Sequence, residues 1–229
     1  MEPGRGRWGN RAVLFDLGGV LIDWDPRYVY RPLFADDAAM ERFLARVCHA
    51  QWNKGIDAGR PFAEAILERQ REVPEFAEYI GFWASRWPEM LKGEIPGTVA
   101  ILRELKDLGL PLYALSNWSA ETFPIARERF GFLAWFDRII VSGEVGVAKP
   151  DREIFQLAIS QCGLVPAETV FIDDVPANIE AALDLGFDAV LFTGPEALRR
   201  DLAGRRLGGA APGGPALQPA AGARLRSVP

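Results

Sequence analysis

Short apolar runs and longer stretches of helical spacing alternate along this sequence, and together they indicate an α/β fold. The apolar runs have the length of buried strands and lie at 13–15, 112–115, 139–141, 170–172 and 189–192. Between them, apolar residues recur every three or four positions in expected helices at 98–108, 121–130, 151–162 and 177–185. Strands that alternate with helices of this length form βαβ units. The sequence therefore predicts an α/β fold with a mostly parallel sheet and helices on both of its faces.

Residues 24–94 interrupt this alternation, and from Arg27 to about Trp87 the pattern is helical and contains no convincing strand. Apolar and aromatic residues recur at helical spacing on both sides of the segment 57–61 (Asp-Ala-Gly-Arg-Pro), which separates two helices. We therefore expect residues 1–23 and 95–203 to form an α/β core domain with a helical insertion at 24–94. Residues 204–229, rich in Gly, Ala, Pro and Arg, bury too little apolar surface to fold and are expected to be a disordered tail.

Composition and charge exclude several kinds of partner. The chain has a formal net charge of −5 and no cluster of basic residues, which disfavours nucleic acid and anionic membrane surfaces as partners. No apolar run approaches the ~20 residues of a membrane span, and residues 1–11 lack the apolar stretch of a signal peptide. We expect a cytoplasmic protein, a monomer or a homodimer, that acts on a small molecule.

Cysteine and histidine usage excludes several kinds of active site. Cys48 and Cys162 have no metal-binding or redox spacing, and His49 is the single histidine of the chain. One histidine disfavours a Ser-His-Asp triad and a histidine-ligated zinc site. The chemistry therefore has to come from carboxylates, lysine, hydroxyl groups and a metal bound through oxygen.

Polar side chains follow several of the expected strands at the point where each strand ends. Asp16, Ser116 and the pair Asp173 and Asp174 come directly after apolar runs, and Lys149 stands at the mouth of an expected helix. In a parallel sheet the carboxyl ends of the strands share one edge, where ligands bind. Carboxylates that meet there repel one another unless a cation lies between them. Mg²⁺ is the natural cation, and a lysine and a hydroxyl group beside it suit phosphoryl transfer through an aspartyl-phosphate.

Four ordered motifs resemble those of the haloacid dehalogenase (HAD) superfamily. They are the segments 15–21 (Phe-Asp-Leu-Gly-Gly-Val-Leu), 115–117 (Leu-Ser-Asn), 149–151 (Lys-Pro-Asp) and 171–174 (Phe-Ile-Asp-Asp). The resemblance spans residues 12–203 and implies a Rossmann-like core. It also implies that the helical insertion is the small helical cap of that family.

The resemblance assigns a metal site and a nucleophile. It implies that Asp16 is the nucleophile and a Mg²⁺ ligand, and that the carbonyl group of Gly18 is a further ligand. Of the acidic pair, we expect Asp174 to bind Mg²⁺ directly and Asp173 to bind it through water.

The same resemblance assigns the substrate contacts. It implies that Ser116 hydrogen-bonds an oxygen of the transferring group and that Lys149 holds both Asp16 and the phosphoryl group. Asn117 is expected to support the substrate through its backbone N–H.

One position departs from the pattern of the family's phosphatases. They carry a second Asp two residues after the nucleophile, which protonates the leaving alcohol and activates water, whereas this chain has Gly18 there. General acid–base catalysis is typically worth 10²–10⁴-fold. Three readings follow: a phosphatase that uses another group or an ordered water, a 2-haloacid dehalogenase acting through an aspartyl ester, or a non-catalytic domain that binds phosphate or a partner. A halide needs no proton, but the dehalogenases do without Mg²⁺ and typically lack the acidic pair.

We therefore predict Mg²⁺-dependent hydrolysis of a small phosphomonoester through an aspartyl-phosphate. Relatives with Asp-Leu-Gly at the first strand end are regarded as sugar-phosphate phosphatases, so we expect a substrate of that type. Asp23 and Asp25 are alternative acids for which we expect structural roles instead. Near the internal turn of the expected cap, three further residues are weaker candidates for substrate contact, and turn or surface chemistry is the simpler expectation for them: Asn53, Asp57 and Arg60.

Overall fold

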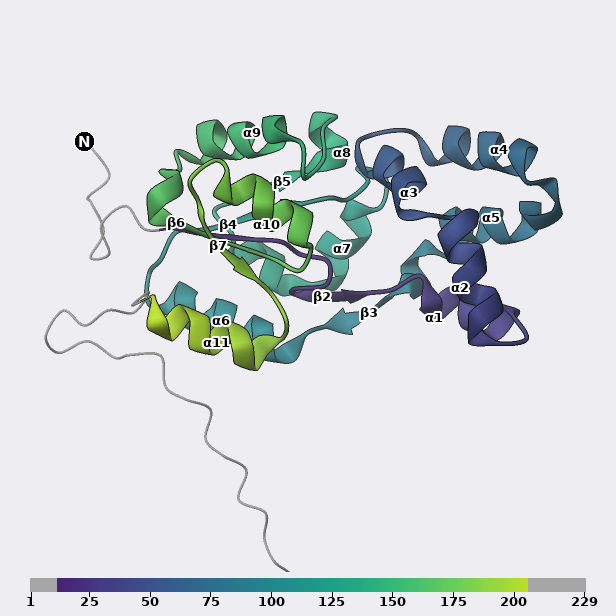
Figure 1. The fold of residues 1–229 in the computed structure, drawn as a ribbon. Helices are drawn as coiled ribbons and strands as arrows, with labels where there is room; N and C mark the ends of the chain where they lie inside the picture. The colour runs from purple at the N-terminus through teal and green to yellow at the C-terminus, as the bar shows by residue number, and fades with distance from the viewer. Residues whose placement is uncertain (1–11, 206–229) are drawn as a thin grey trace, which may run out of the picture.

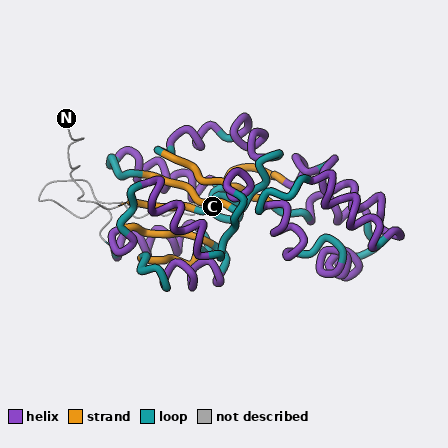
Figure 2. The backbone as a smooth tube through the Cα atoms, turned by 90° about the horizontal axis from the view of Figure 1, so that it is seen from above, coloured by secondary structure: helices purple, strands orange, loops and turns teal. Residues whose placement is uncertain are grey.

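The computed structural model describes residues 12–205, and a five-stranded parallel sheet forms its centre (Figures 1 and 2). The strand order is β5-β4-β1-β6-β7, and every neighbouring pair is parallel. The strands are β1 (Ala12–Phe15), β4 (Leu112–Ser116), β5 (Arg138–Val141), β6 (Thr169–Asp173) and β7 (Asp188–Leu191). This arrangement confirms the predicted α/β class with a mostly parallel sheet, and β1 lies at the middle of it.

Helices cover both faces of the sheet because its central strand is apolar on both sides. Val13 and Phe15 of β1 are buried in one hydrophobic cluster, whereas Leu14 is buried in a second cluster. Outside residues 24–94, the helices with buried residues in the first cluster are α6 (Pro96–Asp107), α7 (Phe123–Arg129) and α11 (Pro195–Gly204). The helices with buried residues in the second are α9 (Arg152–Cys162) and α10 (Pro176–Leu183). Successive side chains of a strand point to opposite faces of the sheet, so an apolar strand contributes buried residues to both clusters.

Residues 24–94, which we call the cap, form a helical group beyond one end of the sheet (Figure 1). Its helices are α1 (Arg27–Tyr30), α2 (Asp37–Arg46), α3 (Ala50–Asp57), α4 (Phe62–Glu72) and α5 (Ala77–Ser85). Aromatic side chains pack between them: the rings of Tyr30 and Trp83 are stacked with centroids 6.1 Å apart. The domain boundaries at 23/24 and 94/95 stay a prediction.

Residues 27–87 contain no strand, as the sequence predicts, but two short strands that the sequence pattern does not predict lie at the ends of the cap. Strands β2 (Ile22–Trp24) and β3 (Leu91–Glu94) form an antiparallel pair in which Ile22 lies opposite Glu94. The chain leaves the core and returns to it along this ribbon, so the two crossings run side by side and pair. Strands of three and four residues are too short for their pattern to distinguish them from a loop.

Two further expectations concern the C-terminal part of the chain. Gly204, placed in the tail by the sequence pattern, is the last residue of α11. Residues 206–229, the rest of the predicted tail, lie outside the described residues. Within residues 12–205, no helix combines the length and the apolar character that a membrane crossing requires.

Candidate active site

The carboxyl ends of three neighbouring strands bring the predicted site residues to one edge of the sheet. Asp16 directly follows β1, while Ser116 and Asp173 are the last residues of β4 and β6. Phe15 pairs in register with Ile172, which places Asp16 and Asp173 at the same level on adjacent strands. All three side chains are buried at the edge where α/β proteins bind ligands.

Lys149 lies between the two buried carboxylates. Its Nζ atom is 3.0 Å from Oδ1 of Asp16 and 2.6 Å from Oδ2 of Asp173, and its side chain is fully buried. Burial alone would lower the pKa of Lys149, but the two carboxylates outweigh burial and leave its pKa above the ordinary value. Lys149 therefore carries a permanent positive charge next to Asp16.

A third carboxylate completes an acidic cluster that fits a divalent cation. One oxygen each of Asp16, Asp173 and Asp174 lie within 4.8 Å of one another. Burial raises the pKa of Asp16 to about 7; Lys149 opposes this rise, and the other two carboxylates add to it. Burial, followed by the charge of Asp173, also raises the pKa of Asp174. Crowded carboxylates that resist ionisation are what a Mg²⁺ site presents before a cation neutralises it.

The two members of the acidic pair differ in how many partners they have. Asp173 accepts hydrogen bonds from Lys149 Nζ, from the backbone N–H of Val175 at 2.8 Å and from Asn178 Nδ2 at 2.9 Å. Asp174 is exposed and lies against Gly19, where an added Cβ would overlap its carboxylate. The sequence reasoning missed Asn178, whose signal is a polar residue in the first turn of the helix after the acidic pair.

Asn117 positions Lys149 through its side chain. Its Nδ2 atom donates to the backbone carbonyl of Lys149 at 2.9 Å, and its Oδ1 accepts from the backbone N–H of Lys149 at 2.8 Å. This two-bond clamp ties the end of β4 to the segment that carries Lys149. The predicted role of the Asn117 backbone N–H stays a prediction.

Gly18 has room for a larger side chain. It lies in the turn between β1 and β2, and a Cβ added there would meet no atom within 4 Å. An Asp side chain would therefore fit at this position. Lack of space does not explain why the chain has glycine here instead of Asp.

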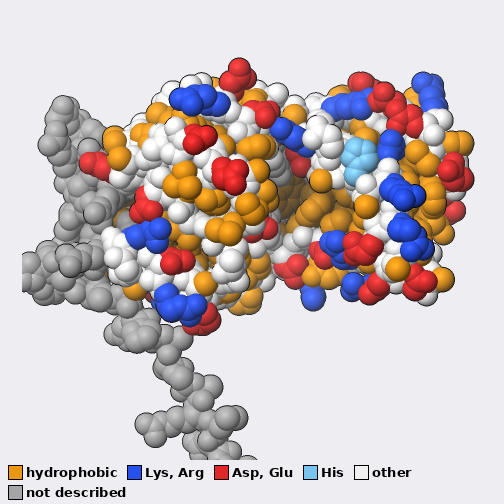
Figure 3. Space-filling model, in the orientation of Figure 1, with side chains coloured by type: hydrophobic (Ala, Val, Ile, Leu, Met, Phe, Trp, Pro, Cys, Tyr) orange, Lys and Arg blue, Asp and Glu red, His pale blue; other side chains and the backbone are white. Residues whose placement is uncertain are grey.

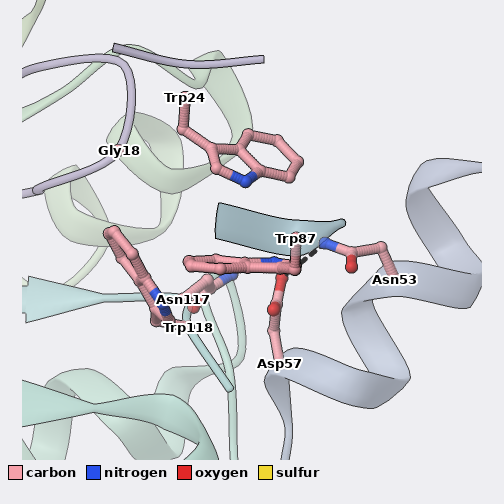
Figure 4. A pocket seen from close by; sticks show the side chains of 7 residues that line it. All are labelled: Gly18, Trp24, Asn53, Asp57, Trp87, Asn117 and Trp118. Carbon is pink, nitrogen blue, oxygen red and sulfur yellow. Dashed lines mark hydrogen bonds between the residues drawn. The ribbon is translucent and has the colours of Figure 1, made fainter. Parts of the chain in front are cut away.

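Two connected hollows lie between the sheet edge and the cap. A small pocket of about 60 Å³ is lined by Gly18, Trp24, Asn53, Asp57, Trp87, Asn117 and Trp118 (Figure 4). A larger cleft of about 490 Å³ shares Trp24, Asn53, Asp57 and Asn117 with it and reaches Lys149. The space-filling view shows a hollow in the surface between the part that contains the sheet and the helical part (Figure 3). A substrate in the cleft would therefore contact both the cap and the core.

The remaining candidates fall into two groups. Asp23 accepts from the Tyr28 hydroxyl group at 2.8 Å, and Asp25 accepts from the backbone N–H of Arg27 at 2.8 Å, so both have structural partners. Arg60 pairs with exposed glutamates of α4. Asn53 and Asp57, in contrast, both line the two hollows.

Mg²⁺ is expected to raise the melting temperature of the protein. A ligand at a hundredfold excess over its Kd adds about 2.7 kcal/mol of stability, which corresponds to about 5–10 °C for a domain of this size. The pKa of Asp16 without metal is about 7, and Mg²⁺ binds ionised carboxylates, so the rise should be larger at pH 8 than at pH 6. Thermal scans with Mg²⁺ and with EDTA at both pH values measure it.

Two variants locate the cation. Asp174→Asn should reduce the rise, because it removes one charge of the cluster. Asp184→Asn, at an exposed position at the far end of α10, should keep the full rise. An undiminished rise in the Asp174→Asn protein would contradict a cation site at this cluster.

Comparison with known sequences finds hydrolases. A family model of haloacid dehalogenase-like hydrolases matches residues 89–186. A sesquiterpene phosphatase of Aspergillus oryzae is 27% identical over 80% of this chain and 90% of its own length. A phosphorylated carbohydrates phosphatase of Thermotoga maritima is 27% identical over 78% of this chain and 83% of its own.

Comparison with solved structures finds the same fold. A HAD family enzyme of Bacteroides thetaiotaomicron, in complex with magnesium and inorganic phosphate, has a TM-score of 0.60 at 25% identity. The match covers 81% of this chain and 96% of that enzyme. An L-2-haloacid dehalogenase shares the fold with a TM-score of 0.61 at 22% identity, over 78% of this chain and 84% of its own.

Proposed function

The chain belongs to the haloacid dehalogenase-like hydrolases, and we propose that it hydrolyses a small phosphomonoester with Mg²⁺ through an aspartyl-phosphate on Asp16. One observation carries the proposal: Asp16 stands at the end of the central strand with Lys149 3.0 Å away and two further carboxylates beside it. A nucleophile, a fixed cation and a divalent-metal site then meet at one point, as phosphoryl transfer requires.

Each residue of the site has a defined task in this reaction. A carboxylate oxygen of Asp16 attacks phosphorus, and Lys149 favours the ionised form of that carboxylate while it offers positive charge to the phosphoryl oxygens. Asp173 holds Lys149 in place, and the buried Ser116 lies at the same strand edge as a hydroxyl donor. Asp16, Asp174, the Gly18 carbonyl group and Asp173 through water would hold Mg²⁺, which would supply charge neutralisation.

The dehalogenase alternative is less well supported by the site. Displacement of halide from a 2-haloacid needs one carboxylate nucleophile and no divalent cation. Three carboxylates within 4.8 Å would then repel one another and the anionic substrate, although Lys149 pairs with two of them. The likeness to the L-2-haloacid dehalogenase concerns the fold.

Two substrate classes are candidates. The relative that acts on phosphorylated carbohydrates supports a sugar phosphate. The cleft supports an apolar ester instead, because Trp24, Trp83 and Leu44 are among its lining residues, and the other relative is a sesquiterpene phosphatase. We propose the sugar phosphate as first choice and a prenyl monophosphate as the second.

The proposed function predicts phosphate release that depends on Mg²⁺. We expect the protein to hydrolyse p-nitrophenyl phosphate with Mg²⁺ and to lose this activity in EDTA, and to release no halide from L-2-chloropropionate. Phosphate assays on a panel of sugar phosphates and prenyl monophosphates then decide the substrate class. Halide release that persists in EDTA, without phosphate release, would contradict the proposal, and inactivity in every assay would favour a non-catalytic domain.

The cellular location, oligomeric state and partners of the enzyme stay predictions from the sequence. We propose a cytoplasmic enzyme, a monomer or a homodimer, with a phosphorylated small molecule and no nucleic acid or membrane as its partner.

A further inference from the structure

The proposed reaction needs a proton donor that the turn after β1 does not supply. An alcohol leaves phosphorus readily when its oxygen is protonated as the ester bond breaks. Gly18 has no side chain for this task, Asp16 acts as the nucleophile, and Lys149 is held between two carboxylates. Another wall of the same hollow can supply the donor.

Asp57 lies on the opposite wall of the small pocket. It is the last residue of α3 in the cap, and it lines the pocket together with Gly18 and Asn117 of the core. The side chains of Asp57 and Asn53 point into the pocket from one helix (Figure 4). The volume of about 60 Å³ suffices for a leaving oxygen and a water molecule, because a cavity needs about 10–15 Å³ to hold one water.

Two tryptophan side chains that line the pocket have no hydrogen-bond partner within residues 12–205 for their indole N–H groups. The indole N–H groups of Trp24 and Trp118, which both line it, are buried without a partner among the described residues. Buried donors are normally satisfied, so two such groups among the side chains of one pocket are unusual.

The backbone around Asp57 is fixed to the core. The buried hydroxyl group of Ser142 donates to the carbonyl group of Asp57 and accepts from the backbone N–H of Trp118 at 2.8 Å. Two residues on, Gly59 has φ +100°, and a Cβ there would approach the carbonyl oxygen of Gly143 to 3.2 Å. This close joint between cap and core holds Asp57 at the sheet edge.

The surroundings of the Asp57 carboxyl group favour its protonated form more than water does. Asn53 Nδ2 donates to Oδ2 of Asp57 at 2.8 Å, which leaves Oδ1 to carry a proton. Burial, and to a smaller extent the negative charge of Asp16, raises the pKa of Asp57 to about 7. Lys54, the nearest cation on the same helix, is engaged with Asp151 at 2.9 Å.

We propose that Asp57 is the general acid and base of this enzyme, supplied by the cap in place of the side chain absent at Gly18. The inference rests on the proposed phosphatase function. In the first step a carboxylate oxygen of Asp16 forms a bond to phosphorus, and the bond from phosphorus to the ester oxygen breaks. The electron pair of that bond stays on the ester oxygen, which takes the proton of Asp57 and leaves as the alcohol.

The second step returns the proton. The Asp57 carboxylate removes a proton from water while the water oxygen bonds to phosphorus, and the bond from phosphorus to Asp16 breaks. Its electron pair restores the carboxylate of Asp16, and inorganic phosphate leaves. Ester and water have then become alcohol and phosphate, and Asp57 is again protonated.

The test compares two leaving groups in the Asp57→Asn protein. Asparagine has the same shape and cannot donate an acidic proton. With an alkyl phosphate, kcat/KM should fall by about 10²–10⁴-fold. With p-nitrophenyl phosphate, whose leaving phenolate needs no proton, kcat/KM should stay close to that of the wild type. An equal loss with both esters, or no loss with either, would overturn the inference.

A matched control and a rescue sharpen the test. Asp23→Asn, which changes a carboxyl group bonded to Tyr28 and outside the pocket lining, should leave both values unchanged. Gly18→Asp in the Asp57→Asn protein should recover activity on the alkyl ester, since the position has room for a side chain. Absence of phosphate release by the wild-type protein on either ester would remove the proposed function itself. That outcome differs from a selective loss that fails to appear.

Discussion

Replacement of Asp16 by asparagine is expected to reduce phosphate release by a factor on the order of 10⁶, as loss of a catalytic nucleophile does. An amide oxygen does not form the acyl-phosphate, so no part of the reaction proceeds through this position. The loss should be equal for alkyl and p-nitrophenyl esters, in contrast to the selective loss expected at Asp57. Steady-state kinetics on both esters measure it, and retained turnover would remove Asp16 from the role of nucleophile.

The same substitution is expected to stabilise the metal-free fold. Folding raises the pKa of Asp16 from 3.8 to about 7, so ionisation of this group costs stability that grows as pH rises from about 4 and is complete above about 7. A difference of this size corresponds to about 4 kcal/mol. In EDTA at pH 8, the Asp16→Asn protein should therefore melt several degrees above the wild type, and at pH 4 the difference should vanish. A lower melting temperature at pH 8 would contradict the crowding of carboxylates.

The sheet and the strand-end residues could be predicted because local patterns determine both. Strand β1 is buried on both faces, so it reads as an uninterrupted apolar run that ends abruptly at Asp16. The parallel arrangement then brings Asp16, Ser116 and Asp173 to one edge, whatever the details of packing. The spacing of apolar residues, two positions apart in strands and three to four apart in helices, is sufficient to predict this part of the fold.

The contacts between cap and core could not be predicted in the same way. The ribbon of β2 and β3 pairs segments about seventy residues apart, and its register depends on where the cap lies. From the sequence, Asp57 has the character of a turn residue. It lines the same pocket as Gly18 because Ser142 of the core bonds the Asp57 carbonyl group, and no local pattern encodes that contact. The clamp from Asn117 to Lys149 likewise joins two loops through geometry that no local spacing encodes.

Lys149→Met is expected to destabilise the protein strongly, because it leaves two buried carboxylates without their cation. Removal of one partner of a buried ion pair costs about 3–5 kcal/mol, while methionine fills most of the space of the lysine chain. Urea unfolding at pH 8 in EDTA measures the loss. Lys54→Met, which breaks the more exposed pair with Asp151, is the matched control and should cost at most about 1 kcal/mol.

The pH dependence of this loss distinguishes charge from packing. Lys149 lowers the pKa of Asp16, so without it the pKa of Asp16 in the fold lies further above its unfolded value. A group with a raised folded pKa loses stability as pH rises through that pKa, so the deficit of the Lys149→Met protein should shrink between pH 8 and pH 5. Mg²⁺ should also reduce it at pH 8, since it replaces the missing positive charge at the cluster. A deficit that is unaffected by pH and by Mg²⁺ would mean that Lys149 acts by filling space, and that Asp16 does not depend on it for its ionised state.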